Sequence, residues 1–410
     1  MKGLSNWLKG LLGLAALAAL GLALAWLLPT AGQEPVVEQR VVATNTPALA
    51  DVVTPADTPL PESVRTLTAT VENQETVRIL YAVQPSRGAA TLWTLDLTPG
   101  GKELASSELT TSPIPVEGLR LYEIPISPDG CYAALNLRGR AENLDTEVWT
   151  VDFQSGALAQ LPPLHHSGLI FMDWIPGTNR LLARDLDGGA IALMNRDGSD
   201  VQELPYHMFQ DGAASPDGQQ FVLSAMEENT FWFLNTDGTL IKTVPVPGKE
   251  RPGGGAPFGL TWSPDGQKLA YSDNFADENS QIRVMVMNTG KLEYLSSDDA
   301  GSIFPVWFQD SATLLYLRDP RPGTVNWDGG DPARWNTSLW MAEVKTEQYR
   351  VLVPSGDKAC WSPAWLPDGS AIVFVSNRLG QNDIWLVNRD GSGLRQLTTR
   401  GDVAALDIFP

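Results

Sequence analysis

Short runs of alternating apolar and polar residues occur along most of the chain and return in the same order. In KLAYSD, at 268–273, the large apolar residues Leu269 and Tyr271 alternate with small or polar ones. Alternation with a period of two places successive side chains on opposite faces of an extended chain. Equivalent runs occur at 180–185, 220–225, 313–318 and 371–377. We predict a β-strand at each.

A tight turn precedes each of these runs. It contains Pro-Asp-Gly at Pro128, Pro216, Pro264 and Pro367, while weaker copies have Pro176 and Gln309. Pro presets φ at the first central position and Gly takes the left-handed conformation, a combination that suits a hairpin. An apolar stretch comes before the turn and ends near Trp174, Trp262, Trp307 and Trp365. We predict that this stretch is the first strand of the hairpin.

Two more strands are expected after each hairpin. The third is predicted at 91–97, 147–153, 190–196, 230–236, 282–288, 338–344 and 383–389. After a second turn, such as Asn-Arg-Asp-Gly-Ser at 388–392, a short fourth strand is predicted at 201–204, 240–244, 292–295, 349–352 and 394–397. The third strands share a Trp at one position in five copies, Trp93, Trp149, Trp232, Trp340 and Trp385. Such regularity indicates core packing rather than a ligand cage.

Four antiparallel strands repeated every 40 to 58 residues or so are typical of a β-propeller, in which blades bury their faces against one another around an axis. The seven third strands predict an all-β, seven-bladed propeller of four-stranded antiparallel blades, with six blades as the alternative. The first blade lacks an obvious first strand. Either 405–410, which resembles 301–305, or 64–71 from the N-terminal side is expected to complete it and close the ring.

Two stretches are specific enough to suggest a family. WSPDGQKLAYSDN at 262–274 and IVFVSNRLGQNDIWLVNRDGSGLRQLT at 372–398 resemble the repeats of the TolB-like family, also called PD40 or WD40-like repeats, and the resemblance extends over roughly 77–400. It implies an extracytoplasmic bacterial propeller that binds other molecules, often envelope proteins. TolB itself pairs an α/β domain with a six-bladed propeller. The chain therefore differs from TolB proper, and the partner of TolB is not carried over to it.

The N-terminus predicts a membrane anchor. Residues 11–28 are uncharged and follow Lys2 and Lys9; eighteen helical residues span about 27 Å, close to the thickness of a bilayer core. Segment 1–28 is therefore expected to be a single-pass transmembrane helix, with everything after it outside the cytoplasm. The alternative is a cleaved signal peptide and a secreted protein. Segment 29–62 is rich in Pro and Thr and is expected to be a disordered tether, and 63–410 the propeller.

Composition narrows the range of partners. The chain has 29 Lys and Arg against 48 Asp and Glu, a net charge of −19. A charge of this sign repels phosphate backbones and excludes nucleic acid as an expected partner. Cys131 and Cys360 are the two cysteines. The repeat places them in non-neighbouring blades, further apart than the Cα separation of about 4.4–6.8 Å that a disulfide allows. We expect two free thiols.

The variable loops predict the binding surface. In a propeller, the loops between second and third strands share one face with the connections between blades, and an insertion in an otherwise economical repeat suggests function. The longest loop, 318–338, contains Trp327, Asp328, Asp331, Arg334 and Trp335. Aromatic rings with carboxylates suit a sugar or peptide ligand. The alternative is a loop that packs on itself and covers a blade edge.

Histidines supply the remaining candidates. His165, His166 and His207 are the three histidines, and all follow predicted fourth strands, so they are expected on the same loop face. Some propeller lyases hold a metal with histidines in the central funnel, but exposed or hydrogen-bonded histidines account for the same pattern. The Asp- and Gly-rich stretches 184–189 and 326–332 lack the full spacing of a calcium loop. No Gly-x-Ser-x-Gly motif occurs.

These patterns lead to one expected function and one alternative. The chain is expected to be an extracytoplasmic, membrane-tethered propeller that binds a protein or a cell-wall glycan of the envelope through its loop face. In this interpretation it catalyses nothing and needs no cofactor or metal. The alternative is a propeller lyase or hydrolase that acts on a polysaccharide with histidines and carboxylates in the funnel.

Overall fold

A computed structural model describes residues 76–85, 89–110, 113–114, 119–139, 146–165, 168–186, 189–226, 228–246, 256–273, 280–296, 300–320 and 332–410. All of them belong to the compact unit Pro59–Pro410. The predicted anchor 1–28 and tether 29–62 lie outside the described residues. Within the described ranges, no helix is long and apolar enough to cross a membrane.

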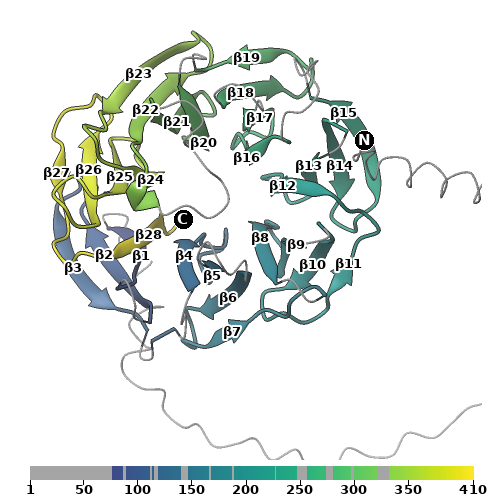
Figure 1. The fold of residues 1–410 in the computed structure, drawn as a ribbon, viewed down its shortest axis with the longest axis horizontal. Helices are drawn as coiled ribbons and strands as arrows, with labels where there is room; N and C mark the ends of the chain where they lie inside the picture. Colours follow the sequence, from purple (N-terminus) through teal and green to yellow (C-terminus); the bar gives the residue numbers. More distant parts are fainter. Residues whose placement is uncertain are drawn as a thin grey trace, which may run out of the picture. The chain divides into compact units, whose positions relative to one another are not determined.

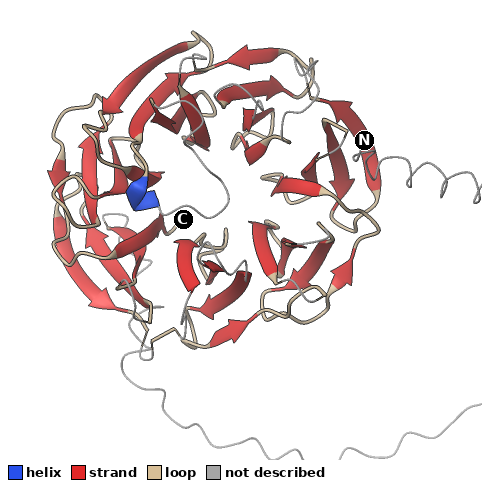
Figure 2. Ribbon diagram, viewed as in Figure 1, coloured by secondary structure: helices blue, strands red, loops and turns tan. Residues whose placement is uncertain are grey.

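Seven four-stranded antiparallel sheets surround a central channel like the blades of a propeller (Figure 1). The prediction of seven blades is confirmed, and the alternative of six is wrong. In each blade the first strand lies next to the channel and the fourth lies at the rim. We number the blades from 1, which contains β1 to β3, to 7, which contains β24 to β27. Almost everything between strands is turn or loop, and Figure 2 shows one short helix, η1, beside the channel.

Within each blade the strands follow one another from the channel to the rim. Blade 1 consists of β28 (Val403–Ile408), β1 (Val77–Val83), β2 (Thr91–Leu97) and β3 (Glu103–Glu108); blade 2 of β4 (Leu119–Glu123), β5 (Tyr132–Gly139), β6 (Thr146–Asp152) and β7 (Leu158–Gln160); blade 3 of β8 (Leu169–Trp174), β9 (Arg180–Asp185), β10 (Ile191–Asn195) and β11 (Gln202–Glu203). Blade 4 consists of β12 (Phe209–Ala214), β13 (Gln220–Ala225), β14 (Thr230–Asn235) and β15 (Leu240–Pro245); blade 5 of β16 (Phe258–Trp262), β17 (Lys268–Asp273), β18 (Gln281–Val286) and β19 (Leu292–Tyr294). Blade 6 consists of β20 (Gly301–Trp307), β21 (Thr313–Asp319), β22 (Ser338–Glu343) and β23 (Gln348–Val353), with η1 (Pro332–Arg334) between β21 and β22; blade 7 consists of β24 (Cys360–Trp365), β25 (Ala371–Ser376), β26 (Asp383–Asn388) and β27 (Arg395–Gln396).

The C-terminal strand closes the ring. β28 pairs antiparallel with β1, so that Ile79 lies opposite Ile408 and Val83 opposite Val403. Beyond the strand, the ring of Phe409 packs on that of Phe153 in blade 2, with centroids 5.0 Å apart. Of the two closures that the sequence left open, the one by the C-terminal residues is observed, and the rival segment 64–71 lies outside the described residues.

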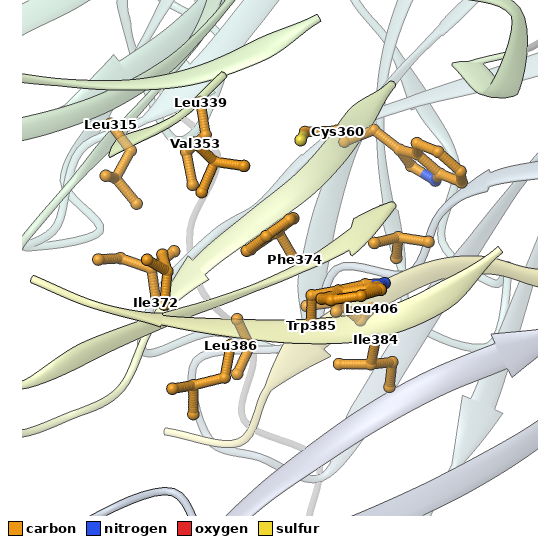
Figure 3. Close-up of a cluster of buried hydrophobic side chains, with 14 of the residues drawn as sticks. Leu315, Leu339, Val353, Cys360, Ile372, Phe374, Ile384, Trp385, Leu386 and Leu406 are labelled. Atoms are coloured by element: carbon orange, nitrogen blue, oxygen red, sulfur yellow. The ribbon is translucent and has the colours of Figure 1, made fainter. Parts of the chain in front are cut away.

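The core consists of apolar layers between neighbouring blades. Blade 7 is a clear case, because its strands β25 and β26 lie between side chains of blade 6 and of β28 (Figure 3). Phe374, Ile372 and Leu386 are fully buried there. A blade alone would leave both of these faces in water, so closure of the ring is what buries them.

The tryptophans of the third strands pack as part of each blade. Trp385 is buried and the other four are partly buried. Each indole of those four donates a hydrogen bond to the side chain two residues earlier, as in Trp232 Nε1 to Thr230 Oγ1 at 3.0 Å and Trp340 Nε1 to Ser338 Oγ at 2.8 Å. These residues stabilise the outer half of the blade.

Both kinds of turn lie on one face of the ring, which we call the turn face. Asp129, in the Pro-Asp-Gly turn of blade 2, pairs with Arg196, in the second turn of blade 3, at 2.6 Å. Asp310 and Arg389 make the equivalent pair between blades 6 and 7, at 3.4 Å. The opposite face, called the loop face below, is where the described ends of the remaining connections lie. The predicted division of the loops between two faces is confirmed.

Candidate functional site

The inner strands of all seven blades are irregular, and this irregularity shapes the channel. Each contains a β-bulge, where the pairing with the second strand shifts by one residue. A bulge turns an unpaired residue away from the regular ladder. The bulge residues of blades 2 to 4 are Tyr122, Met172 and Gln210, and all three line cavities in the channel.

Two bulges require an uncommon backbone conformation. Phe304 has φ of 56° and Ser362 has φ of 46°, and the equivalent residue of blade 5 is Gly259, with φ of 60°. The left-handed region is unfavourable for residues other than Gly and is an outlier for a bulky one. Such conformations persist where the surrounding structure enforces them, and they cluster at functional sites. Phe304 and Ser362 both line the channel.

The channel holds two adjoining cavities. The first, which we call the apolar chamber, has a volume of about 320 Å³ and is lined mainly by aromatic and aliphatic side chains, among them Phe171, Phe304, Trp335 and Trp361. The second, the polar chamber, has a volume of about 420 Å³. Both volumes are in the range of small-molecule sites. Glu123, Asn136, Arg138, Phe171, Met172 and Phe304 line both chambers.

The apolar chamber contains part of the long loop. Pro332 and Trp335 lie in its wall, and the Trp335 indole stacks on the ring of Phe304, with centroids 6.3 Å apart and planes at 19°. The neighbouring loop holds this segment in place, because Asn377 Nδ2 donates to the Ala333 carbonyl at 2.7 Å. The described end of the insertion is therefore folded against the channel and contributes an aromatic wall to the cavity.

The polar chamber lies toward the loop face, because Arg138 and Arg184 stand near the loop-face ends of β5 and β9. Arg184 is 8% exposed and Asn136 2% exposed. Burial lowers the pKa of the Arg184 guanidinium; Asp211 acts in the opposite sense, and Arg138 adds to the lowering. The chamber thus combines buried guanidinium, amide and carboxylate groups beside the ring of Phe171.

Three aspartates of the inner strands connect adjacent blades. Each accepts one backbone N–H from the residue after it and a second from the next blade: Asp407 from Ile126 at 2.8 Å, Asp173 from Ala214 at 2.9 Å and Asp211 from Leu260 at 3.0 Å. Burial raises the pKa of Asp173 to about 7, and the pKa values of Asp211 and Asp407 to about 6. They line the chambers, but both oxygens of each carboxyl group are engaged by the backbone.

The predicted residues of the long loop lie in different places. Trp335 lines the apolar chamber, whereas Arg334 is exposed at the end of η1. Trp327, Asp328 and Asp331 lie outside the described residues. The structure thus brings one of the five predicted loop residues to the cavity.

The described histidines lie away from both chambers. His165 Nδ1 is 3.2 Å from Asp185 Oδ2, and its Nε2 is 3.6 Å from Glu203 Oε1. His207 is exposed on the connection between β11 and β12, and His166 falls outside the described ranges. Neither described histidine lines the channel cavities. Among all the residues that the structure describes, no group of three or more His, Cys, Asp or Glu residues could hold a metal ion.

Sequence reasoning did not identify the chamber residues. Arg184 and Asp173 stand inside predicted strands and Asn136 in the stretch after the Pro128 turn, and all three look like ordinary members of the alternating pattern. A signal was present in the Asp that recurs within inner strands, at 173, 211 and 407, where an apolar residue is expected. Cys131 is exposed and Cys360 is buried, and both are free thiols.

Comparison with known proteins identifies the repeats. A stretch of 124 residues, 30% of this chain, is 41% identical to the Tol-Pal system protein TolB of Anaeromyxobacter dehalogenans and covers 24% of that protein. This stretch is homologous to TolB. The predicted resemblance to TolB-like repeats is confirmed, and the seven blades distinguish the chain from TolB proper. No protein-family model matches the chain.

Two other similarities extend the comparison. A stretch of 147 residues, 34% of the chain, is 23% identical to dipeptidyl-peptidase 5 of Porphyromonas gingivalis and covers 20% of that protein. The chain thus spans about a quarter or less of the length of these curated relatives. The structure of a periplasmic gluconolactonase from Pseudomonas aeruginosa superposes with a TM-score of 0.53 at 15% identity, over 82% of this chain and 99% of that one. This likeness concerns the fold.

Proposed function

We propose that the protein is an extracytoplasmic binding module whose partner docks on the loop face, at the mouth of the central channel. The observation that carries the proposal is the pair of adjoining channel cavities, one of which is lined by Trp335 of the longest loop. Ligand sites are typically cavities of this size, with aromatic walls and a few polar groups that fix orientation. Phe304 and Ser362, held in strained conformations at the same place, support a functional role for it.

The partner in this proposal is a protein or a glycan of the cell envelope. Homology of one stretch to a Tol-Pal system protein supports an envelope partner, and the net charge of −19 argues against nucleic acid. Residues 11–28 anchor the chain as an uncleaved single-pass helix, and 29–62 tether the propeller outside the cytoplasm. The uncharged run after two lysines supports this arrangement.

Site-specific crosslinking in the full chain tests where the partner docks. A photo-crosslinking residue is placed at Trp335 on the loop face, and a matched one at Asp237, which is exposed in a turn-face turn. In native envelopes we expect one discrete adduct from position 335 and none from position 237. Deletion of 322–331 is expected to reduce that adduct. An adduct that forms equally from position 237, or that survives unlabelled competitor protein in excess, contradicts the proposal.

A second candidate function is a polysaccharide-degrading enzyme. The observation that favours it is Asp173, which lines the apolar chamber and has a pKa of about 7 because it is buried. A carboxyl group titrating near neutral pH suits general acid catalysis. Against this role, both oxygens of Asp173 accept backbone N–H groups, and the described histidines lie elsewhere. Release of reducing ends from acidic polysaccharides by the wild type, and its loss in Asp173→Asn, would favour the enzyme.

A further inference from the structure

Two buried polar side chains of the polar chamber have unused hydrogen-bonding capacity. Asn136 Nδ2 donates to Glu123 Oε2 at 3.4 Å, while Asn136 Oδ1 is buried without any partner among the described residues. Arg184 Nη1 donates to the Asp185 carbonyl at 3.1 Å, which is the one hydrogen bond its side chain makes in the described structure. A buried polar atom left unsatisfied costs about 1–3 kcal/mol, so Asn136 Oδ1 calls for an explanation, and Arg184 lines the same chamber with donors to spare.

The chemistry of these groups defines what would satisfy them. A guanidinium is a planar multiple donor that matches a carboxylate, and a second one, Arg138, lines the same chamber. Asn136 Oδ1 needs a donor and the carboxylate of Glu123 beside it can accept one, and hydroxyl groups supply both. Because Glu123 and Asp211 are also present, a singly charged carboxylate fits better than a doubly charged phosphate. The ring of Phe171 offers an apolar wall to the carbon skeleton.

We infer that the polar chamber binds a carboxylate-bearing saccharide, a hexuronate unit, with its carboxylate at Arg184 and its hydroxyls at Asn136 and Glu123. The volume of about 420 Å³ accommodates more than one such unit, and the apolar chamber adjoins it through Phe171 and Phe304. The site is a small-molecule subsite of the proposed loop-face surface. It does not depend on which macromolecule docks there.

A matched pair of sugars tests the inference in the full chain. Calorimetric titration in detergent compares α-1,4-digalacturonate with α-1,4-galactobiose, which differ in their carboxylates. We expect the uronate to bind about tenfold or more tightly than galactobiose, since a polar site rejects a ligand that leaves its groups unpaired. Arg184→Gln is expected to remove this preference. Arg350→Gln, which changes an exposed arginine on the outer strand β23, is the control and is expected to leave it unchanged.

Several results would overturn the inference. These are equal affinities for the two sugars, absence of binding by either at millimolar concentration, or full uronate affinity in Arg184→Gln. If Arg184→Gln fails to fold, Asn136→Asp provides the test. The new carboxylate beside Glu123 should weaken the binding of the uronate and leave the affinity for galactobiose unchanged. If no sugar binds while crosslinking from position 335 persists, the saccharide site is wrong and the proposed docking face stands.

Discussion

The indole of Trp335 stacks on the ring of Phe304 at 6.3 Å, and so joins the insertion of blade 6 to the bulge of its own inner strand. Trp335 and Phe304 both line the apolar chamber. Phe304 also has the left-handed backbone conformation, with φ of 56°, and its N–H is fixed by Ser272 Oγ of blade 5 at 3.1 Å. Trp335 is thus one of the residues through which the loop is connected to the channel wall.

Double-mutant cycles are expected to detect this connection. Trp335→Ala and Phe304→Leu, singly and together, should give a coupling free energy of about 0.5–1.5 kcal/mol, the range measured for aromatic pairs. Chemical denaturation followed by circular dichroism provides the values. Trp335→Phe retains an aromatic ring and should keep most of the stability. A coupling near zero would show that the loop is not held by this contact.

The inner-strand aspartates are expected to make stability depend on pH. Burial raises the pKa of Asp173 from its ordinary value of 3.8 to about 7. Between these two values the folded state binds more protons than the unfolded state, so its contribution to stability is present at low pH and is lost as pH rises through about 7. Asp173→Asn does not titrate. The free energy of unfolding of the wild type minus that of Asp173→Asn is therefore expected to decrease from pH 5 to pH 8.

Asp237→Asn is the control for this titration. Bonds from the Thr239 hydroxyl and N–H hold the pKa of Asp237 below 3.8, so its protonation is the same in both states above pH 5. The free energy of unfolding of the wild type minus that of Asp237→Asn should therefore stay constant between pH 5 and pH 8. A flat profile for Asp173→Asn as well would contradict the raised pKa of Asp173.

The ion pair between Arg196 and Asp129 on the turn face is expected to contribute modestly to the free energy of unfolding. Arg196 Nη2 lies 2.6 Å from Asp129 Oδ2, with side chains 11% and 44% exposed, and the guanidinium also lies over the ring of Tyr132. Partial exposure screens the pair, so a cycle of Arg196→Ala and Asp129→Ala should give a coupling of about 0.5–1 kcal/mol. A salt concentration of about half a molar should reduce this coupling free energy. A coupling insensitive to salt would point to packing on Tyr132 instead.

The closing strand is expected to be a sensitive part of the core. Leu406 of β28 is 6% exposed and belongs to the layer between blades 7 and 1 (Figure 3). Leu406→Ala should lower the free energy of unfolding by about 2–5 kcal/mol. Leu379→Ala is the matched control, since Leu379 is 71% exposed, and should change stability by less than about 0.5 kcal/mol. Similar small effects of both substitutions would show that β28 is loosely attached.

Much of the fold follows from local sequence. The strands predicted at 180–185, 220–225 and 268–273 coincide with β9, β13 and β17, because a Pro-Asp-Gly turn or its weaker copy fixes where each hairpin begins. The fourth strand of blade 1, β3, was not predicted. All six of its residues are exposed, so no alternation between buried and solvent-facing positions marks it.

The site was predictable only in part. The loop face and Trp335 were anticipated from the length of the insertion. Asn136 and Arg184 were not, because they stand in neighbouring blades and meet at one cavity only when the ring closes. The histidines share a face by chain position, yet the pairing of His165 with Asp185 directs it to the connection beside blade 3 rather than to the axis.

The bulges separate the lining of the channel from the frame that supports it. Tyr122, Met172 and Gln210 occupy extra positions outside the hydrogen-bonded ladder, so replacing one of them leaves the pairing of its sheet intact. Blades 2 to 4 therefore each contribute a channel side chain that evolution or an engineer can exchange independently of the other two. A receptor built this way can acquire a new specificity one substitution at a time, while the strand pairing of its sheets stays intact.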